Sequence, residues 1–101
     1  MKAPIEPGRV VFSKKGRDKT RYFVVLYTVD ADFVVISDGD TRKLDHLKKK
    51  RRKHLESCPI EAPELIESFQ AGTLKDSDIR KVLFPLIKGK SEETLNNMRE
   101  G

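Results

Sequence analysis

The sequence predicts a mainly β fold, with a small antiparallel barrel in the first half followed by two or three short helices. Short runs of β-branched and aromatic residues alternate with tight turns over roughly the first fifty residues. After Cys58, apolar residues recur at helical spacing between prolines and a glycine. The chain has 101 residues and a hydrophobic content of 37%, which suits one domain with a small core.

The first half of the chain is expected to form short strands joined by polar turns. Three segments have the β-branched and aromatic composition of strands: 9–13 (RVVFS), 21–29 (RYFVVLYTV) and 33–37 (FVVIS). The turns are 14–20, with Gly16 at its tip, 30–32, and 38–40, where Asp-Gly tolerates the positive φ of a tight hairpin. Two weaker segments are expected as strands four and five: 41–44 and 54–56. The basic run between them then forms a loop, with Leu47 and Leu55 anchored in the core.

Helices are expected in the second half, because Pro59 and Pro63 interrupt the strand pattern. The first runs over PELIESFQAG, with Pro63 in the first turn and Gly72 as its C-terminal stop. The second begins with Asp76 or Ser77 as its N-cap and ends or kinks at Pro85. Residues 91–101 form a weak final helix or a frayed end.

These helices are expected to pack on the barrel, so that residues 1–57 form the barrel and 58–101 a helical extension. The 21–29 strand is apolar on both faces, and one face would otherwise meet water. Leu65, Phe69, Ile79 and Val82 provide an apolar stripe at helical spacing to cover it. We favour this core role over the alternative, a surface for a protein partner.

Charge is unevenly distributed along the chain, whose formal net charge is +5. Residues 1–55 contain fifteen Lys and Arg against seven Asp and Glu, a net +8, and residues 56–101 contain six against nine, a net −3. An anionic partner is therefore expected for the first half. Three basic runs bracket the apolar strands, and the loops of a small barrel can bring them into one surface. We favour this reading over three separate solvated stretches.

The surface is expected to bind nucleic acid, since several Lys and Arg together neutralise phosphates and release their counterions. Its residues are Lys14, Lys15, Gly16, Arg17, Lys19, Arg42, Lys43, Lys48, Lys49, Lys50, Arg51, Arg52, Lys53 and His54. The helices are acidic rather than basic, so structured RNA fits better than a major groove. Tyr22, Tyr27 and Phe33 have rings that can stack on a base, but their strand positions favour core packing. The run KKKRRK also satisfies the permissive pattern of a nuclear-import signal, and the two roles are compatible.

No catalytic chemistry, cofactor or metal is expected. The sequence has no Gly-rich phosphate loop, nucleophile elbow or His-Glu-x-x-His motif. His46, His54 and Cys58 would make a poor zinc site without a second cysteine. One cysteine, no apolar run of signal-peptide length and none of membrane-spanning length predict a soluble, cytoplasmic protein without membrane contact. We expect it to act as a monomer.

The segment from Glu6 to Leu55 resembles the KOW-motif domains of large-subunit ribosomal proteins, the group containing archaeal and eukaryotic proteins fourteen, six and twenty-seven. Gly8, Val10 and Val11 open the motif, Gly16 is the loop glycine, and the strand following it begins at Tyr22. The later DGDTRK and KHL are similar to the closing part of the pattern found in protein fourteen. The chain as a whole, including GTLKDSDIRKVL, is similar to short KOW-domain RNA-binding proteins of Gram-positive bacteria. The match is firm over residues 5–56 and looser over 62–84.

This resemblance implies an SH3-like barrel and binding to ribosomal RNA, with the large ribosomal subunit as the expected partner. It places RNA contacts on the basic residues of the first loop, on Arg42 and Lys43, and on the 48–54 stretch. Thr20 departs from the pattern, because many members have glycine there. The alternative function is an SH3-like protein-interaction module, a transcription or translation accessory factor whose basic face binds an acidic partner.

Overall fold

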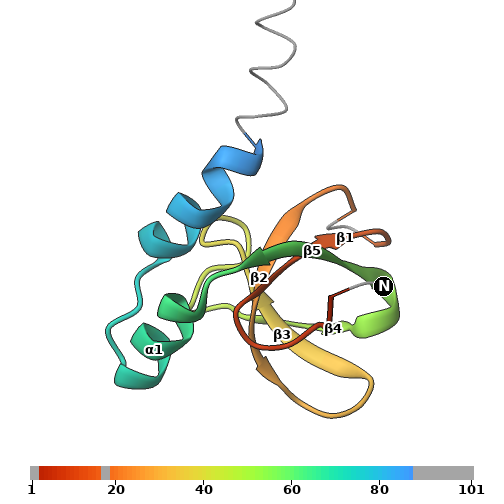
Figure 1. Ribbon diagram of the computed structural model, residues 1–101, viewed down its shortest axis with the longest axis horizontal. Coiled ribbons are helices and arrows are strands. Elements are labelled where there is room, and N and C mark those ends of the chain that lie inside the picture. Colours follow the sequence, from red (N-terminus) through yellow and green to blue (C-terminus); the bar gives the residue numbers. More distant parts are fainter. Residues whose placement is uncertain (1–2, 17–18, 88–101) are drawn as a thin grey trace, which may run out of the picture.

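The computed structural model describes residues 3–16 and 19–87, which form a five-stranded antiparallel sheet with two helices at its C-terminal end. The strands are β1 (Arg9–Ser13), β2 (Tyr22–Thr28), β3 (Phe33–Ser37), β4 (Lys48–Arg51) and β5 (Leu55–Glu61). They lie in the order β4-β3-β2-β1-β5, and the 3-10 helix η1 (Arg52–His54) joins the two edge strands. Helix α1 (Pro63–Ala71) follows, and a second helix covers 76–87. The predicted mainly β fold with C-terminal helices is confirmed, whereas the sheet is not closed (Figure 1).

An apolar cluster lies on each face of the sheet, because successive strand residues point to opposite sides. One cluster is formed by Val11, Phe23, Val25, Val34, Ile36 and Leu55. The other contains Val10 and Val24 of the sheet together with Ala62, Leu65, Ile79 and Leu83, and so joins the sheet to both helices. Figure 1 shows the two helices next to each other on one side of the sheet. Strand β5 extends to Glu61, beyond the expected end of the barrel segment at residue 57.

Helix α1 has the boundaries that its sequence predicts. Pro63 lies in its first turn, and Gly72 ends it with a positive φ of 75°. The Gly72 N–H donates to the Phe69 carbonyl at 3.1 Å, so this glycine satisfies a carbonyl that the helix leaves unpaired.

The second helix differs from the prediction at both ends. It begins at residue 76, so neither Asp76 nor Ser77 is its N-cap; instead the Asp78 carboxylate accepts the Lys75 N–H at 3.0 Å. It also continues through Pro85 to residue 87, so Pro85 does not end it. Lys81, one turn before Pro85, is exposed, and its carbonyl can therefore bond to water in place of the missing N–H. The final helix predicted at 91–101 lies outside the described residues.

The prediction that the basic run forms a loop is wrong. Lys48–Arg51 is strand β4, which pairs with β3 in the register Val34↔Lys50 and Ile36↔Lys48, and Arg52–His54 is η1. Lysine has a low strand propensity. Pairing with β4 overrides this preference, because it provides partners for the backbone N–H and C=O groups at the edge of β3. Lysines are also common on exposed edge strands, where they discourage further pairing. Of the two flanking leucines, Leu55 is buried and Leu47 half-buried.

The strand predicted at 41–44 is also wrong, because the side chain of Asp38 folds the segment into a turn. The buried Asp38 carboxylate accepts hydrogen bonds from the Asp40 N–H (2.9 Å), the Thr41 hydroxyl (2.7 Å) and the Arg42 N–H (2.7 Å). These local bonds compete with extended structure.

Pro59 does not interrupt the sheet as predicted, but lies within β5. Arg9 pairs with Glu61 and Val11 with Ser57, so residues 58–60 lie opposite a single β1 residue. A proline is tolerated at such an irregularity on an edge strand, because a residue there does not need an N–H to bond to the neighbouring strand. The predicted fifth strand at 54–56 thus begins at Leu55 and is longer than expected.

Thr20 is the only residue other than glycine with a positive φ (69°) within 3–16 and 19–87. A side chain with Cβ is strained in this conformation by about 1–2 kcal/mol. Thr20→Gly relieves this strain, but part of the gain is lost because glycine has a larger chain entropy in the unfolded state. We therefore expect the free energy of unfolding to rise by about 0.5–1 kcal/mol. Thermal denaturation beside Thr20→Ala, which keeps Cβ and most of the strain, checks this. A melting temperature for the glycine variant below that of the alanine variant would contradict it.

Candidate nucleic-acid interface

The loop between β1 and β2 is held against η1, which brings together two of the three basic runs. The Lys14 N–H donates to the His54 carbonyl at 2.8 Å. The Lys15 carbonyl accepts a bond from the Lys50 ammonium at 2.9 Å. Residues 35 or more apart in sequence are thus joined at one end of the sheet. We call Lys14, Lys15, Arg51, Lys53 and His54 the basic cluster; Lys50 lies beneath it.

His54 reports on the electrostatics of the basic cluster. Its pKa is lowered from 6.5, first by partial loss of hydration and then by the positive charges of Lys15, Lys50, Lys53 and Arg51. Four cations therefore act on one imidazole, and their combined field favours an anion at this position.

Lys50 has a different role from its neighbours in the run. Because Lys50 pairs with buried Val34, its side chain lies on the inner face of β4, and it is only 8% exposed. Its ammonium donates to the Lys15 carbonyl, and a Cβ added to Gly16 would lie 3.1 Å from this ammonium. Gly16, whose φ is +85°, therefore lets the loop close over Lys50. Lys50 supports the loop from inside and positions its neighbours.

The side chain of Arg52 is also engaged within the protein. Its guanidinium donates to the Ile5 carbonyl at 2.6 Å and contacts the Thr28 hydroxyl at 3.4 Å. Its backbone N–H donates to the Asp32 carbonyl at 2.8 Å. These contacts tie the N-terminal segment and the β2–β3 turn to η1. Arg52 is therefore a structural residue that orients Arg51 and Lys53 on either side.

Lys49 and Arg51 point to the outer face of β4, where both lie over the ring of Phe33. The Lys49 ammonium and the Arg51 guanidinium carbon are each 4.9 Å from the ring centroid. Sequence reasoning missed this grouping because it treated the run as a loop. The signal was available in the alternation of a strand, which places residues 49 and 51 on one side.

The remaining predicted residues are more dispersed. Lys19 is exposed in the β1–β2 loop, and Lys48 is half-buried at the start of β4. Arg42 and Lys43 lie in the β3–β4 connection, which is attached to the second helix by the Leu44 N–H to Asp76 carboxylate bond. Arg17 lies outside the described residues.

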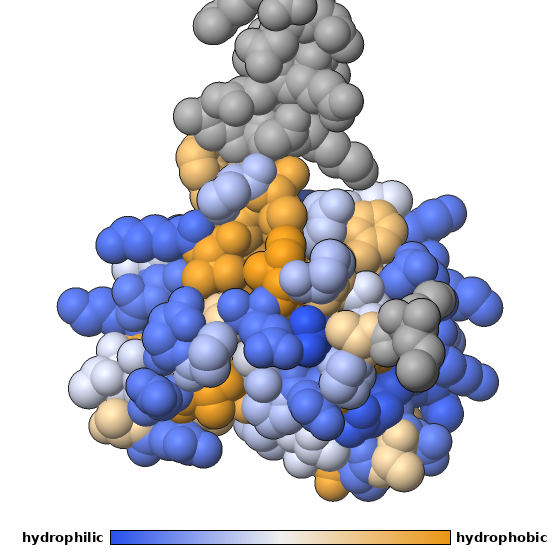
Figure 2. All heavy atoms as spheres, in the orientation of Figure 1, coloured by the Kyte–Doolittle hydropathy of each residue, from blue (hydrophilic) through white to orange (hydrophobic). Residues whose placement is uncertain are grey.

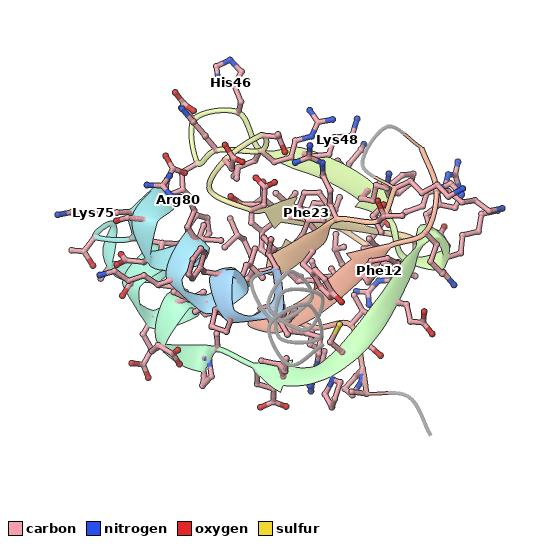
Figure 3. All side chains as sticks on the ribbon, turned by 90° about the horizontal axis from the view of Figure 1, so that it is seen from above. Phe12, Phe23, His46, Lys48, Lys75 and Arg80 are labelled. Carbon is pink, nitrogen blue, oxygen red and sulfur yellow. The ribbon has the colours of Figure 1, made fainter. Side chains whose placement is uncertain are left out.

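In Figure 3, nitrogen-tipped side chains surround the end of the sheet away from the helices, with Lys48 on that side. Lys75 lies at the opposite, helical end. A shallow hollow of about 230 Å³ lies between the β2–β3 turn and η1, lined by Ala31, Asp32, Arg51, Arg52 and Lys53. Of the basic cluster, Arg51 and Lys53 therefore line this recess, together with the acidic Asp32.

Other parts of the described structure have a different chemistry. A hollow of about 550 Å³ lies between the sheet and the second helix, and its lining includes Tyr22, Asp38, Leu83, Phe84 and Ile87. Figure 2 shows apolar side chains gathered where this helix meets the sheet, surrounded by hydrophilic ones. Burial and the nearby Glu56 raise the pKa of the Cys58 thiol.

Metal and membrane features are not found in residues 3–16 and 19–87. No group of three or more His, Cys, Asp or Glu side chains there is arranged to hold a metal ion. No helix in the same residues has the length and apolar character needed to span a bilayer.

No model of a known protein family matches this chain. The interface must therefore be interpreted from its own geometry. That geometry combines exposed ammonium groups, a guanidinium and a half-buried imidazole at one end of a small sheet. Groups of this kind bind phosphate oxygens by charge-assisted hydrogen bonds.

Proposed function

We propose that this chain is a non-enzymatic RNA-binding protein that contacts the phosphates of structured RNA through the basic cluster. The single observation that carries the proposal is the junction of the β1–β2 loop with η1. There the Lys14–His54 and Lys50–Lys15 bonds bring two basic runs into one field. If the 48–53 run were only a solvated surface stretch, no buried lysine would be needed to hold the β1–β2 loop beside it, as Lys50 does.

RNA is favoured over duplex DNA by the shape of this surface. The basic cluster lies on loops and strands. Helix α1 contains no Lys or Arg, and in the second helix Arg80 and Lys81 are accompanied by Asp76 and Asp78, so neither helix has the basic face of a recognition helix for a major groove. Contacts to phosphates and 2′-hydroxyls of a folded RNA need no such helix.

We further propose that the five-stranded sheet is an incompletely closed form of the SH3-like barrel of KOW domains. Support comes from η1, which links the edge strands β4 and β5 through bonds to both neighbouring turns: Arg52 N–H to Asp32 and Lys14 N–H to His54. Gly8 and Gly16 have positive φ values at the two motif positions that call for glycine. On this basis ribosomal RNA is the first candidate ligand, the large ribosomal subunit the first candidate partner and the cytoplasm the expected location.

Binding of the full chain to ribosomal RNA fragments at increasing salt tests the proposal. With several phosphates neutralised, we expect the affinity to fall by roughly two orders of magnitude between about 50 and 200 mM salt. Poly-glutamate, as an acidic protein-like competitor, should displace RNA only in large excess. Tighter binding to poly-glutamate than to RNA would instead support the protein-interaction alternative, and binding to neither would refute both.

A further inference from the structure

The outer face of the β4 edge carries an arrangement that phosphate binding alone does not use. Arg51 pairs with Phe33, Lys49 pairs with Val35, and Val35 pairs with Tyr27. Residues that face each other in an antiparallel pair share one side of the sheet. Phe33, Tyr27, Lys49 and Arg51 therefore lie on the same side, which we call the stacking face.

Both aromatic side chains of the stacking face are at least partly exposed to solvent. Tyr27 is 43% exposed and stacks on Phe69 of α1, with centroids 6.1 Å apart and planes at 11°. Phe33 is half-buried and lies under the exposed side chains of Lys49 and Arg51. The sequence favours core packing of Tyr27 and Phe33 over stacking on a base, but neither side chain is buried.

Lys49 and Arg51 place two positive charges over one ring, and these charges repel each other. An anion between or beside them would relieve that repulsion. The guanidinium of Arg51 is also planar, and nucleic-acid bases stack on arginine planes as they do on aromatic rings. Arg51 belongs both to the stacking face and to the basic cluster, so one RNA strand can reach both.

We propose that an unpaired RNA base stacks on the Arg51–Phe33 pair while the Lys49 ammonium binds a flanking phosphate. The ligand of the stacking face is thus a single-stranded segment, such as a loop or bulge, within the RNA held by the basic cluster. This inference rests on the proposed function.

Two charge-conserving variants of the full chain test the inference, Phe33→Leu and Arg51→Lys. Phe33→Leu keeps an apolar side chain but removes the ring, and Arg51→Lys keeps the charge but removes the plane. Phe84→Leu is the matched control, because Phe84 is 56% exposed on the second helix. The probes are a short single-stranded RNA containing 2-aminopurine and the same strand annealed to its complement.

We expect each test variant to bind the single strand about tenfold more weakly, since stacking of one base contributes a factor of this order. Affinity for the duplex should not change with Phe33→Leu, since Phe33 is not part of the basic cluster. With Arg51→Lys the loss should be larger on the single strand than on the duplex, and the control should match the parent with both probes. Quenching of 2-aminopurine on binding of the parent reports stacking directly, and both variants should abolish it.

Each other outcome counts against a different proposal. Parental binding of both probes by both variants, or equal losses on strand and duplex, would overturn the stacking inference and leave the phosphate interface in place. Failure of the parent to bind either RNA would overturn the proposed function itself. If Phe33→Leu does not fold, Arg51→Lys still decides the question.

Discussion

Replacement of Gly39 by alanine is expected to lower the free energy of unfolding by about 3 kcal/mol, a large share of the stability of a small domain. Gly39 has a φ of +71°, which strains any residue with a Cβ. A Cβ at this position would also lie 2.3 Å from the Asp76 carbonyl oxygen. The added methyl must therefore displace either the turn or the second helix.

Neither element can move easily. The Leu44 N–H donates to the Asp76 carboxylate at 2.8 Å, and Arg80 donates to the Gly39 carbonyl at 2.6 Å. Behind these bonds Ile79 and Leu83 are fully buried against the sheet. A shift of the helix would open this part of the core.

Gly72→Ala is a matched control, because Gly72 has a similar φ of +75° but its added Cβ would meet no atom within 4 Å. It should show the backbone strain alone, about 1 kcal/mol. In a domain of this size 1 kcal/mol corresponds to a shift of roughly 4–8 °C in melting temperature, so thermal denaturation resolves the two variants. Equal shifts for Gly39→Ala and Gly72→Ala would show that the close approach to Asp76 has no energetic consequence.

Reversal of two charges in the basic cluster, Lys15→Glu with Lys53→Glu, is expected to weaken RNA binding about 100-fold at low salt. Both side chains are exposed and both act on His54, so their loss should affect the phosphate interface without altering the core. The salt dependence of binding should become shallower, because fewer counterions are released. Fluorescence anisotropy with a structured RNA at several salt concentrations measures both effects.

The matched control reverses Lys75 and Lys81, which are exposed at the helical end of the molecule. Figure 3 shows Lys75 at the helical end of the molecule, away from Lys48. Both double variants change the net charge by the same amount, so a general electrostatic effect would weaken binding equally. Equal losses would therefore remove the assignment of the interface to the basic cluster.

Local sequence signals predicted much of the fold where side chain and backbone preferences agree. The β-branched runs of β1 and β3 and the Pro63 and Gly72 ends of α1 follow directly from such preferences. The errors occur where tertiary contacts decide. β4 is a strand because the edge of β3 pairs with it, although its sequence is KKKR.

The candidate site was predictable in its composition but not in its internal division of roles. Charge distribution identified the β1–β2 loop and the 48–54 stretch. It could not separate Lys50, buried beneath the loop, or Arg52, bonded to Ile5, from the exposed Lys49 and Arg51. That separation depends on the register of β4, since a shift of one residue would exchange the inner and outer side chains.

The central claim is that RNA contacts the basic cluster, and mapping of backbone amide chemical shifts during an RNA titration tests it most directly. Signals of Lys14, Lys15, Lys53 and His54 should shift or broaden first, while those of the second helix remain unchanged. Changes confined to the second helix and the 39–44 turn, with the basic cluster unaffected, would contradict the account.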